Sequence, residues 1–461
     1  MISLENAFPL YDEEGMKLTP YTFTIQNKCA SYASYNINLE LLDTVTEDNR
    51  LDPQYLKVVL NENTPTILSS NSSVEPTLSN AYASYELTTG YLEQNEEKTY
   101  NLRLWLDENV TLQDPVVGKS IIAKITVTAN YIDHIPTDYD KCVSEYGEDS
   151  IQCSILSQLD TSESCPTVNE DGTVNVTSAE SSAGLLCSAP DDYGTSYYYR
   201  GNVLNNYVSF AGYYWRIVRI NGDGSIRIVY DGTSTHANGE ASEDRQIVAD
   251  VYNSSYNDNA YIGYMFGATG ASTYDETHAN TNDSTIKGVI DNWYKTNIYD
   301  TGYSNYVNDT LFCDDRSFSS VNTGTGAGVN TTYYRWYNSE IKTLNCGQQN
   351  DRFTVDDESI GNGDLTYPVA LLTADEVYLA GGYSASNSGY YLYTGNDFWL
   401  ISPSNFNRYY ARVRYVTETG FANNYTSVNS ENGIRPVINL KPNSLKSGDG
   451  TALNPYLLSG N

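Results

Sequence analysis

Residues 207–230 read YVSFAGYYWRIVRINGDGSIRIVY, and this stretch decides the fold expected for the second half of the chain. Asn221-Gly222 stands between two runs in which apolar and polar residues alternate. An Asn-Gly pair between alternating runs is the strongest short-range signal for a β-hairpin, because both residues tolerate the positive φ of a type I′ turn. We therefore expect two antiparallel strands here, joined by a tight turn.

Two helices are expected later in the same half. Within Thr285–Asn297 the apolar residues recur at i, i+3, i+4 and i+7, the spacing of one helix face. They are Ile286, Val289, Ile290 and Trp293. Thr373-Ala374-Asp375-Glu376 has the pattern of a capping box, and Gly381-Gly382 marks the end of the short helix that it opens. The stretch between the two is rich in Asn, Gly and Thr, so we expect a mixed α+β region with long loops.

Residues 1–130 carry a different pattern. Five runs predict β-strands, and most of them alternate apolar and polar residues, as in a sheet with one buried face. They are residues 21–25, 35–39, 56–60, 98–106 and 123–129. Several strands separated by turn residues predict an antiparallel, immunoglobulin-like β-sandwich. The stretch is similar in style to sandwich domains of secreted fibre-forming and spore-coat-associated proteins of Gram-positive bacteria.

Residues 131–195 contain 13 acidic residues and one basic residue, Lys141, together with four of the seven cysteines. Apolar residues are sparse outside 151–159, so we expect this segment to bury little core and to act as an acidic connector held by disulfides. The predicted domains are therefore a sandwich at 1–130, a connector at 131–195 and a ligand-binding domain at 196–461. The fold class is mostly β, with α+β in the C-terminal part.

The charge of the chain excludes some functions. The 461 residues include 26 basic and 58 acidic residues, a net charge of −32. Binding to nucleic acid or to anionic lipid needs a basic surface, so we expect neither. No apolar run approaches the roughly 18 residues that span a bilayer. The 43 Tyr against 10 Phe and 5 Trp fit a β-rich fold.

The cysteines predict disulfides rather than a metal site. None of them forms a CxxC motif, and His134, His236 and His278 stand at no recognisable ligand spacing. We expect Cys313 to pair with Cys346, two pairs among Cys142, Cys153, Cys165 and Cys187, and Cys29 left over. Spacing does not settle the connectivity, and buried free thiols are the alternative.

The expected location is extracellular, at the cell surface. The start, Met1-Ile2-Ser3-Leu4-Glu5, has neither the basic nor the apolar region of a signal peptide. We expect that an export or anchor segment is missing from the N-terminus, and that any membrane attachment runs through it. The alternative is a natural cytosolic start.

Two stretches near the C-terminus carry a resemblance. Residues 399–404 read WLISPS, and residues 433–440 read GIRPVINL after about thirty residues rich in Asn, Tyr, Ser and Arg. This arrangement resembles the end of the C-type-lectin-like domain of bacterial surface proteins. That group includes the formylglycine-generating-enzyme-like proteins and the variable proteins of diversity-generating retroelements. The resemblance covers about 197–461 and implies a C-type-lectin-like fold that binds a ligand.

The stretch 404–432 is the candidate ligand-binding surface. Arg412-Val413-Arg414-Tyr415-Val416 alternates, so both arginines should leave one face of a strand and point to solvent. The Tyr, Asn, Ser and Arg composition is that of an antibody paratope, and scattered replacements among Asn residues are typical of retroelement-diversified positions. The alternative is a solvated hairpin. The candidate residues are Asn405, Asn407, Arg408, Tyr410, Arg412, Arg414, Phe421, Asn423, Tyr425, Thr426, Asn429 and Ser430.

Catalysis and cofactors have weaker signals. The formylglycine-generating relatives use cysteines near the domain end, and here no Cys follows Cys346. His236 and His278 lie in polar stretches, so we expect them at the surface. The Glu-Pro-Asn, Gln-Pro-Asp and Trp-Asn-Asp motifs of calcium-dependent lectins do not occur. We expect no cofactor; Ca²⁺ at the acids of 356–358 and 364 has little support, because no EF-hand spacing is present.

The sequence therefore predicts a non-catalytic bacterial surface protein for recognition and adhesion. Its C-terminal head would bind a protein on a host or microbial surface through 404–432, with a glycan as the less favoured ligand. The alternative from a structural class is a fibre or surface-layer subunit that assembles through its β-sandwich.

Overall fold

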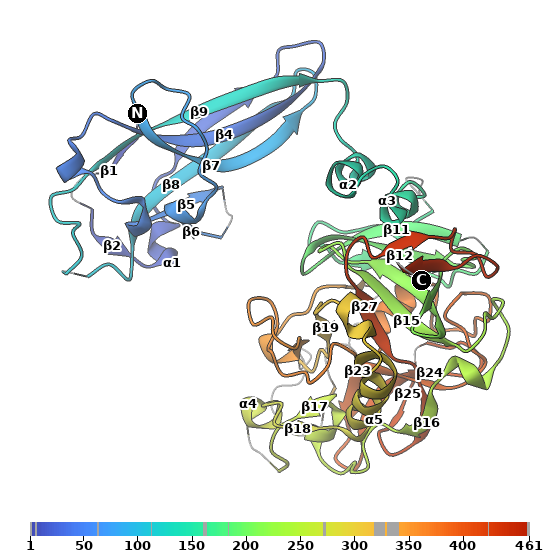
Figure 1. The fold of residues 1–461 in the computed structure, drawn as a ribbon. Helices are drawn as coiled ribbons and strands as arrows, with labels where there is room; N and C mark the ends of the chain where they lie inside the picture. Colours follow the sequence, from blue (N-terminus) through green and yellow to red (C-terminus); the bar gives the residue numbers. More distant parts are fainter. Residues whose placement is uncertain are drawn as a thin grey trace. The chain divides into compact units, whose positions relative to one another are not determined.

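The computed structural model describes residues 2–4, 7–61, 64–111, 113–159, 164–182, 184–270, 273–317, 328–329, 341–422 and 424–458. The chain forms two compact units, Met1–Thr137 and Asp138–Asn461, each with its own buried core (Figure 1). Most of the regular structure is β, as predicted, and the helices are short.

The first unit is a sandwich of two sheets. One sheet has the order β1 (Ile2–Leu4), β9 (Ile121–Ile132), β4 (Tyr32–Leu42) and β7 (Ala81–Leu92). The other has the order β2 (Pro9–Leu10), β8 (Glu97–Asp107), β5 (Leu56–Leu60) and β6 (Thr66–Ile67), with β3 (Tyr21–Gln26) also on β8. Alternate residues such as Ile37, Leu39 and Leu41 are buried in the core. The helix α1 (Asp12–Gly15) precedes β3. All five predicted strands are present, and the short strands β1, β2 and β6 and the long strand β7 are additions to them.

The second unit is built on a sheet of eight strands. Its order is β11 (Gly184–Asp191), β12 (Gly194–Gly201), β14 (Tyr213–Ile220), β13 (Tyr207–Phe210), β29 (Tyr456–Leu458) and β28 (Leu445–Ser447), with β15 (Ile226–Gly232) on β14 and β27 (Val437–Leu440) on β15. The predicted hairpin is confirmed, since Ile220 pairs with Ile226. Its turn differs in one detail: the positive φ, +79°, belongs to Gly224 and not to Gly222. The loop is longer than a two-residue turn. Gly224 takes the left-handed conformation that longer hairpin loops need at their last residue.

A second sheet carries the predicted binding stretch. Its order is β16 (Val248–Val251), β26 (Glu431–Ile434), β23 (Phe398–Phe406), β24 (Ala411–Val416) and β25 (Asn424–Ser427), and β20 (Gly328–Val329) also pairs with β23. Two residues, Arg435-Pro436, join β26 of this sheet to β27 of the first sheet. Three short two-stranded pairs complete the strands: β10 (Val174–Asn175) with β21 (Ile341–Lys342), β17 (Met265–Phe266) with β18 (Asn282–Asp283), and β19 (Phe312–Cys313) with β22 (Arg352–Phe353).

Both predicted helices are present. The helix α5 (Thr285–Tyr294) buries Ile286 and Ile290, and a π-turn at Lys295–Tyr299 continues it. The helix α7 (Ala374–Leu379) begins with the complete capping box of Thr373 and Glu376. A single turn, α4 (Tyr274–Thr277), precedes α5.

Most of the segment expected to be a connector, residues 138–195, belongs to the second unit. It forms α2 (Asp138–Tyr146), α3 (Ile151–Leu156), β10 and β11. Many of its apolar residues are buried in the core of that unit or packed against it, with Cys153, Ile155, Val174 and Val176 fully inaccessible. The division of the chain therefore falls at Thr137/Asp138 and not at residue 195, because sparse apolar residues still form a core when each one is buried.

The six paired cysteines follow the prediction. Cys313 bonds to Cys346, Cys142 to Cys153 and Cys165 to Cys187, and Cys29 is free and exposed. Disulfides persist in oxidising compartments, so three of them indicate an extracellular or otherwise oxidising location. Among the described helices, none combines the length and apolar character that crossing a membrane requires.

Candidate binding site on the β23–β24 hairpin

The turn between β23 and β24 has a strained, fixed conformation. The Asn407 side-chain oxygen accepts hydrogen bonds from the backbone N–H groups of Tyr409 and Tyr410, at 3.1 and 2.8 Å. Arg408, which lies between Asn407 and Tyr409, has a φ of +76°. This left-handed conformation is unfavourable for a residue with a long side chain. Strain of this kind tends to collect at functional sites.

Three tyrosines gather at this turn. Tyr409 is 72% exposed and Tyr410 is 43% exposed. The Tyr410 ring stacks on that of Tyr256, with 5.4 Å between centroids, and the backbone N–H of Ala411 donates to the Tyr256 carbonyl at 2.7 Å. Two segments 150 residues apart in the chain thus present one aromatic surface.

The turn after β25 lies beside the hairpin. The N–H of Val428 donates to the Ala411 carbonyl at 3.0 Å, and the N–H of Asn253 donates to the Val428 carbonyl at 2.9 Å. Asn429, the next residue, is exposed and accepts from the Ser427 hydroxyl. We call the exposed or half-buried group here the tip surface: Tyr256, Asn407, Arg408, Tyr409, Tyr410 and Asn429.

The two arginines of β24 have different environments. Both guanidinium carbons lie near the Tyr425 ring, at 5.4 Å for Arg412 and 5.6 Å for Arg414, so the two residues share a face of the strand as predicted. Arg412 is half-buried, but Arg414 is fully buried. The expectation that both point to solvent is therefore wrong for Arg414. Burial raises the pKa of Tyr378 in α7, and the positive charge of Arg414 opposes this rise. Arg414 therefore lies close to this helix.

The other predicted residues divide by exposure. Asn405 is buried in β23, and its side chain donates to the Ser404 hydroxyl at 3.1 Å. Phe421 and Tyr425 are half-buried, and the hydroxyls of Thr426 and Ser430 hydrogen-bond to each other at 3.0 Å. Asn423 lies outside the described residues. Tyr256 and Tyr409 were not among the residues predicted from the sequence. A signal for Tyr256 was present, because residues 253–257 read NSSYN and are rich in the same residue types as the hairpin.

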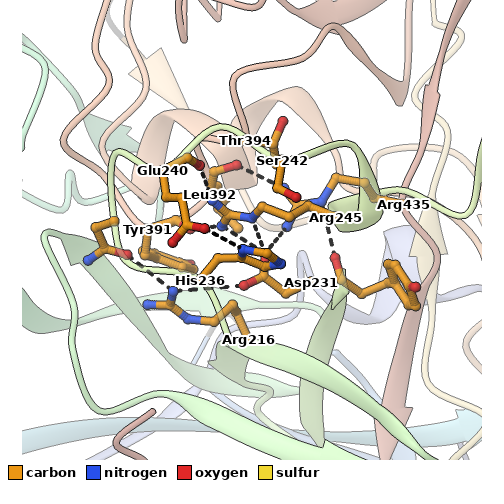
Figure 2. Close-up of polar contacts among 12 residues, drawn as sticks. Arg216, Asp231, His236, Glu240, Ser242, Arg245, Tyr391, Leu392, Thr394 and Arg435 are labelled. Carbon is orange, nitrogen blue, oxygen red and sulfur yellow. Dashed lines mark hydrogen bonds and ion pairs between the residues drawn. The ribbon is translucent and has the colours of Figure 1, made fainter. Parts of the chain in front are cut away.

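A buried ionic network lies between the two sheets. Figure 2 shows Arg245 and Arg435 converging on Asp231, with both Arg245 bonds and the Arg435 bond at 2.8–2.9 Å on one carboxylate oxygen. Arg216 lies 4.0 Å from the other oxygen. Each guanidinium also donates to a backbone carbonyl, as Arg435 does to Leu392 at 2.8 Å. Burial lowers the pKa of Arg435 to about 10 against the attraction of Asp231. Because its donors are engaged, this network fixes the β26–β27 link and is structural.

Both histidines of this unit are buried, contrary to expectation. His236 is 5% exposed. Glu240 lies 3.1 Å from its Nδ1 (Figure 2), and Asp244 lies 2.7 Å from its Nε2. His278 is fully inaccessible, and burial, with Arg316 nearby, lowers its pKa to about 3. Within the described part of the chain, no group of three or more His, Cys, Asp or Glu side chains is placed to hold a metal ion.

The acids considered for Ca²⁺ shape loops. The carboxylate of Asp309 accepts from the backbone N–H groups of Val355, Asp356 and Asp357 at 2.7–3.1 Å. Asp364 accepts from the Asn280 side chain at 2.9 Å. The Asp357 carboxylate accepts from the backbone N–H and the hydroxyl of Ser359.

Comparisons with known proteins give one match to a family model, over part of the second unit, and no function. Residues 328–442 match a family model described as a domain of unknown function, DUF6273. The match covers about a quarter of the chain and includes α7 and the β23–β24 hairpin. No curated protein and no solved structure matches the chain significantly.

Proposed function

We propose that the chain is a non-catalytic bacterial cell-surface protein whose second unit binds a partner through the tip surface. The main support is a cluster of exposed aromatic side chains next to an arginine with a strained backbone. The cluster consists of Tyr256, Tyr409 and Tyr410, and the arginine is Arg408. Exposed tyrosines in a fixed geometry lose little entropy on binding, and Tyr and Arg dominate the energetics of protein interfaces. The three disulfides support an extracellular location.

The tip surface favours a protein partner with exposed carboxylates. Arg408 and the adjoining Arg412 give this hairpin a positive charge within a chain of net charge −32. Guanidinium groups bind carboxylates through paired, charge-assisted hydrogen bonds. Tyr409 and Tyr410 would fill recesses of the partner, and Asn407 and Asn429 would hydrogen-bond at the rim. Arg414 is buried, so it would support Tyr425 from within and would not touch the bound protein.

The fold and the variability of this surface are part of the proposal. The resemblance of residues 399–404 and 433–440 to C-type-lectin-like domains supports a head of that type. It also supports diversification of the hairpin by a retroelement. In such proteins a constant scaffold carries variable exposed positions, and the buried ionic network at Asp231 would belong to that scaffold here.

The test is adhesion of the labelled chain to intact epithelial and bacterial cells. We expect saturable binding that protease treatment of the cells removes, and that Tyr409→Ser with Arg408→Gly lowers at least tenfold. Tyr299→Ser is the matched control, because Tyr299 is also an exposed tyrosine, 54%, in a different element. Equal binding of the tip variant and the control would reject the tip surface as the binding site. Binding that is lost when the cells are treated with glycosidase, and kept when they are treated with protease, would show that the partner is a glycan and not a protein.

A further inference from the structure

We propose that the first unit pairs with a second copy of the chain along the free edge of β9, which joins two four-stranded sheets into one. In the first unit, β1 covers only Ile121–Ala123 of this edge. The following residues of β9, as far as Ile132, pair with β4 on their other side. Among the described residues, no strand pairs with the outer side of Lys124–Ile132 (Figure 1).

This part of β9 is exposed and regular. Residues 127–131 are all exposed, with Val127 at 42% and Tyr131 at 68%. The β4–β9 ladder runs through ten consecutive pairs without a register shift. A straight strand with free backbone groups on one side is a template for another strand.

The opposite edge of the same sheet is protected. On β7, the N–H of Val74 donates to the Ser84 carbonyl at 3.0 Å, and the N–H of Glu86 donates to the Ser72 carbonyl at 2.9 Å. The β4–β7 ladder also has two register shifts. Natural sheets use such cover and irregularity to prevent edge pairing, and the free part of β9 has neither.

The chemistry of the strand favours a second copy. Lys124–Ile132 reads KITVTANYI, with several β-forming residues, no Pro and no acid. Residues 1–130 contain 18 acidic and 8 basic residues, so two copies repel each other over most of their surface. The acid-free edge is the place where they can approach at the lowest electrostatic cost.

An antiparallel pair about a twofold axis at Thr128 gives a compatible register. It sets Val127 opposite Ala129 of the second copy and Ile125 opposite its Tyr131, which is an aromatic and β-branched pair. Lys124 faces an uncharged Ile132, so no like charges meet. Nine residues form a ladder of about 30 Å. Such twofold pairing is closed, because both copies use the same edge of β9, and it gives a dimer and not a filament.

The experiment is sedimentation velocity of the full chain over a concentration series, in a Cys29→Ser background that excludes dimers linked by the free thiol. We expect a reversible monomer–dimer equilibrium. Thr128→Asp places two carboxylates opposite each other and should leave only monomer. Thr89→Asp, the same change at an exposed position of β7, should behave like the parent chain.

A charge-swap mixture makes the test specific. Thr128→Asp and Thr128→Lys should each be monomeric alone and should associate when mixed, because opposite charges then face each other. Near-ultraviolet circular dichroism confirms that each variant is folded. A parent chain that stays monomeric at all concentrations would overturn the proposal, as would a dimer that Thr128→Asp leaves intact. The adhesion test depends on the second unit, so failure of one proposal does not decide the other.

Discussion

At the scale of single residues, buried charges hold the second unit together. Glu376 lies in the first turn of α7 and is fully buried, with Arg219 Nε at 3.1 Å and Arg227 Nη1 at 2.8 Å from one of its oxygens. Its other oxygen accepts the N–H of Thr373 in the capping box. One carboxylate thus caps a helix and neutralises two arginines of β14 and β15.

Replacing Glu376 by Gln should destabilise the second unit strongly. Gln keeps the cap but leaves the buried Arg227 without its carboxylate partner, while Arg219 keeps only Asp191, at 2.7 Å. Breaking a buried pair in this way costs about 3–5 kcal/mol. Denaturant unfolding at neutral pH measures this loss. Glu418→Gln is the control, because Glu418 is exposed and its change should stay within about 0.5 kcal/mol.

The same variant gives a pH dependence with a defined sign. Burial alone would raise the pKa of Glu376, but Arg227 and Arg219 outweigh it and hold the pKa below the ordinary 4.5. A carboxylate with a lowered pKa in the folded state stabilises the fold above its unfolded pKa, and this contribution disappears as the pH falls through the folded value. The difference in unfolding free energy between parent and variant should therefore narrow below about pH 4.5. A difference that stays constant down to about pH 3 would contradict this assignment.

Arg414 shows what alternation can and cannot predict. The pattern of residues 412–416 correctly placed Arg412 and Arg414 on one face of a strand, because the side-chain period of a strand is two. It could not reveal that this face is covered near α7 and open near the hairpin turn. Burial of a charged side chain depends on distant segments, and those leave no trace in the local sequence.

At the scale of elements, prediction succeeded where local chemistry is sufficient. The hairpin at Asn221, the helix at Thr285 and the capping box at Thr373 are all present, since turn residues and periodicity act within a few residues. The strand β7 was missed because Gly90 and mixed polarity weaken its pattern. The structure gives a reason for that glycine: a Cβ at Gly90 would overlap the hydroxyl of Tyr35 on the neighbouring β4.

The hairpin as an element carries the prediction on diversification. We expect the gene segment for residues 404–432, sequenced across many isolates of one strain, to vary at exposed or half-buried positions such as Asn407, Arg408 and Asn429. Asn405 and Arg414 should be constant, because they are 7% and 0% exposed and substitutions there would disturb the core. Variation that is as frequent at these two positions, or an invariant segment, would remove diversification from the proposal.

At the scale of the whole molecule, the main error of the sequence analysis was the domain boundary. Composition marked residues 131–195 as a connector, because 13 acidic residues and few apolar ones predict little core. In the structure, many apolar residues of this segment lie in the core of the second unit or pack against it. The strand β11 forms a continuous ladder with β12 from Gly184↔Gly201 to Asp191↔Gly194. The partners of these residues lie as far as 291 positions away, as between Gln152 and Asn443, so local composition could not identify them.

This boundary has a direct experimental consequence. A fragment of residues 138–461 should fold and unfold in one cooperative transition, because it keeps all three disulfides and the whole core of the second unit. A fragment of residues 196–461 should fail to fold, since it loses β11, the partner strand of β12, and seven buried core residues of α3, β10 and β11. Of the three disulfides it keeps only Cys313–Cys346. Thermal unfolding followed by circular dichroism compares the two, with residues 1–137 as the control for an independent first unit. Equal stability of the 138–461 and 196–461 fragments would mean that residues 138–195 act as a connector after all. Their contacts would then contribute nothing to the stability of the rest of the second unit.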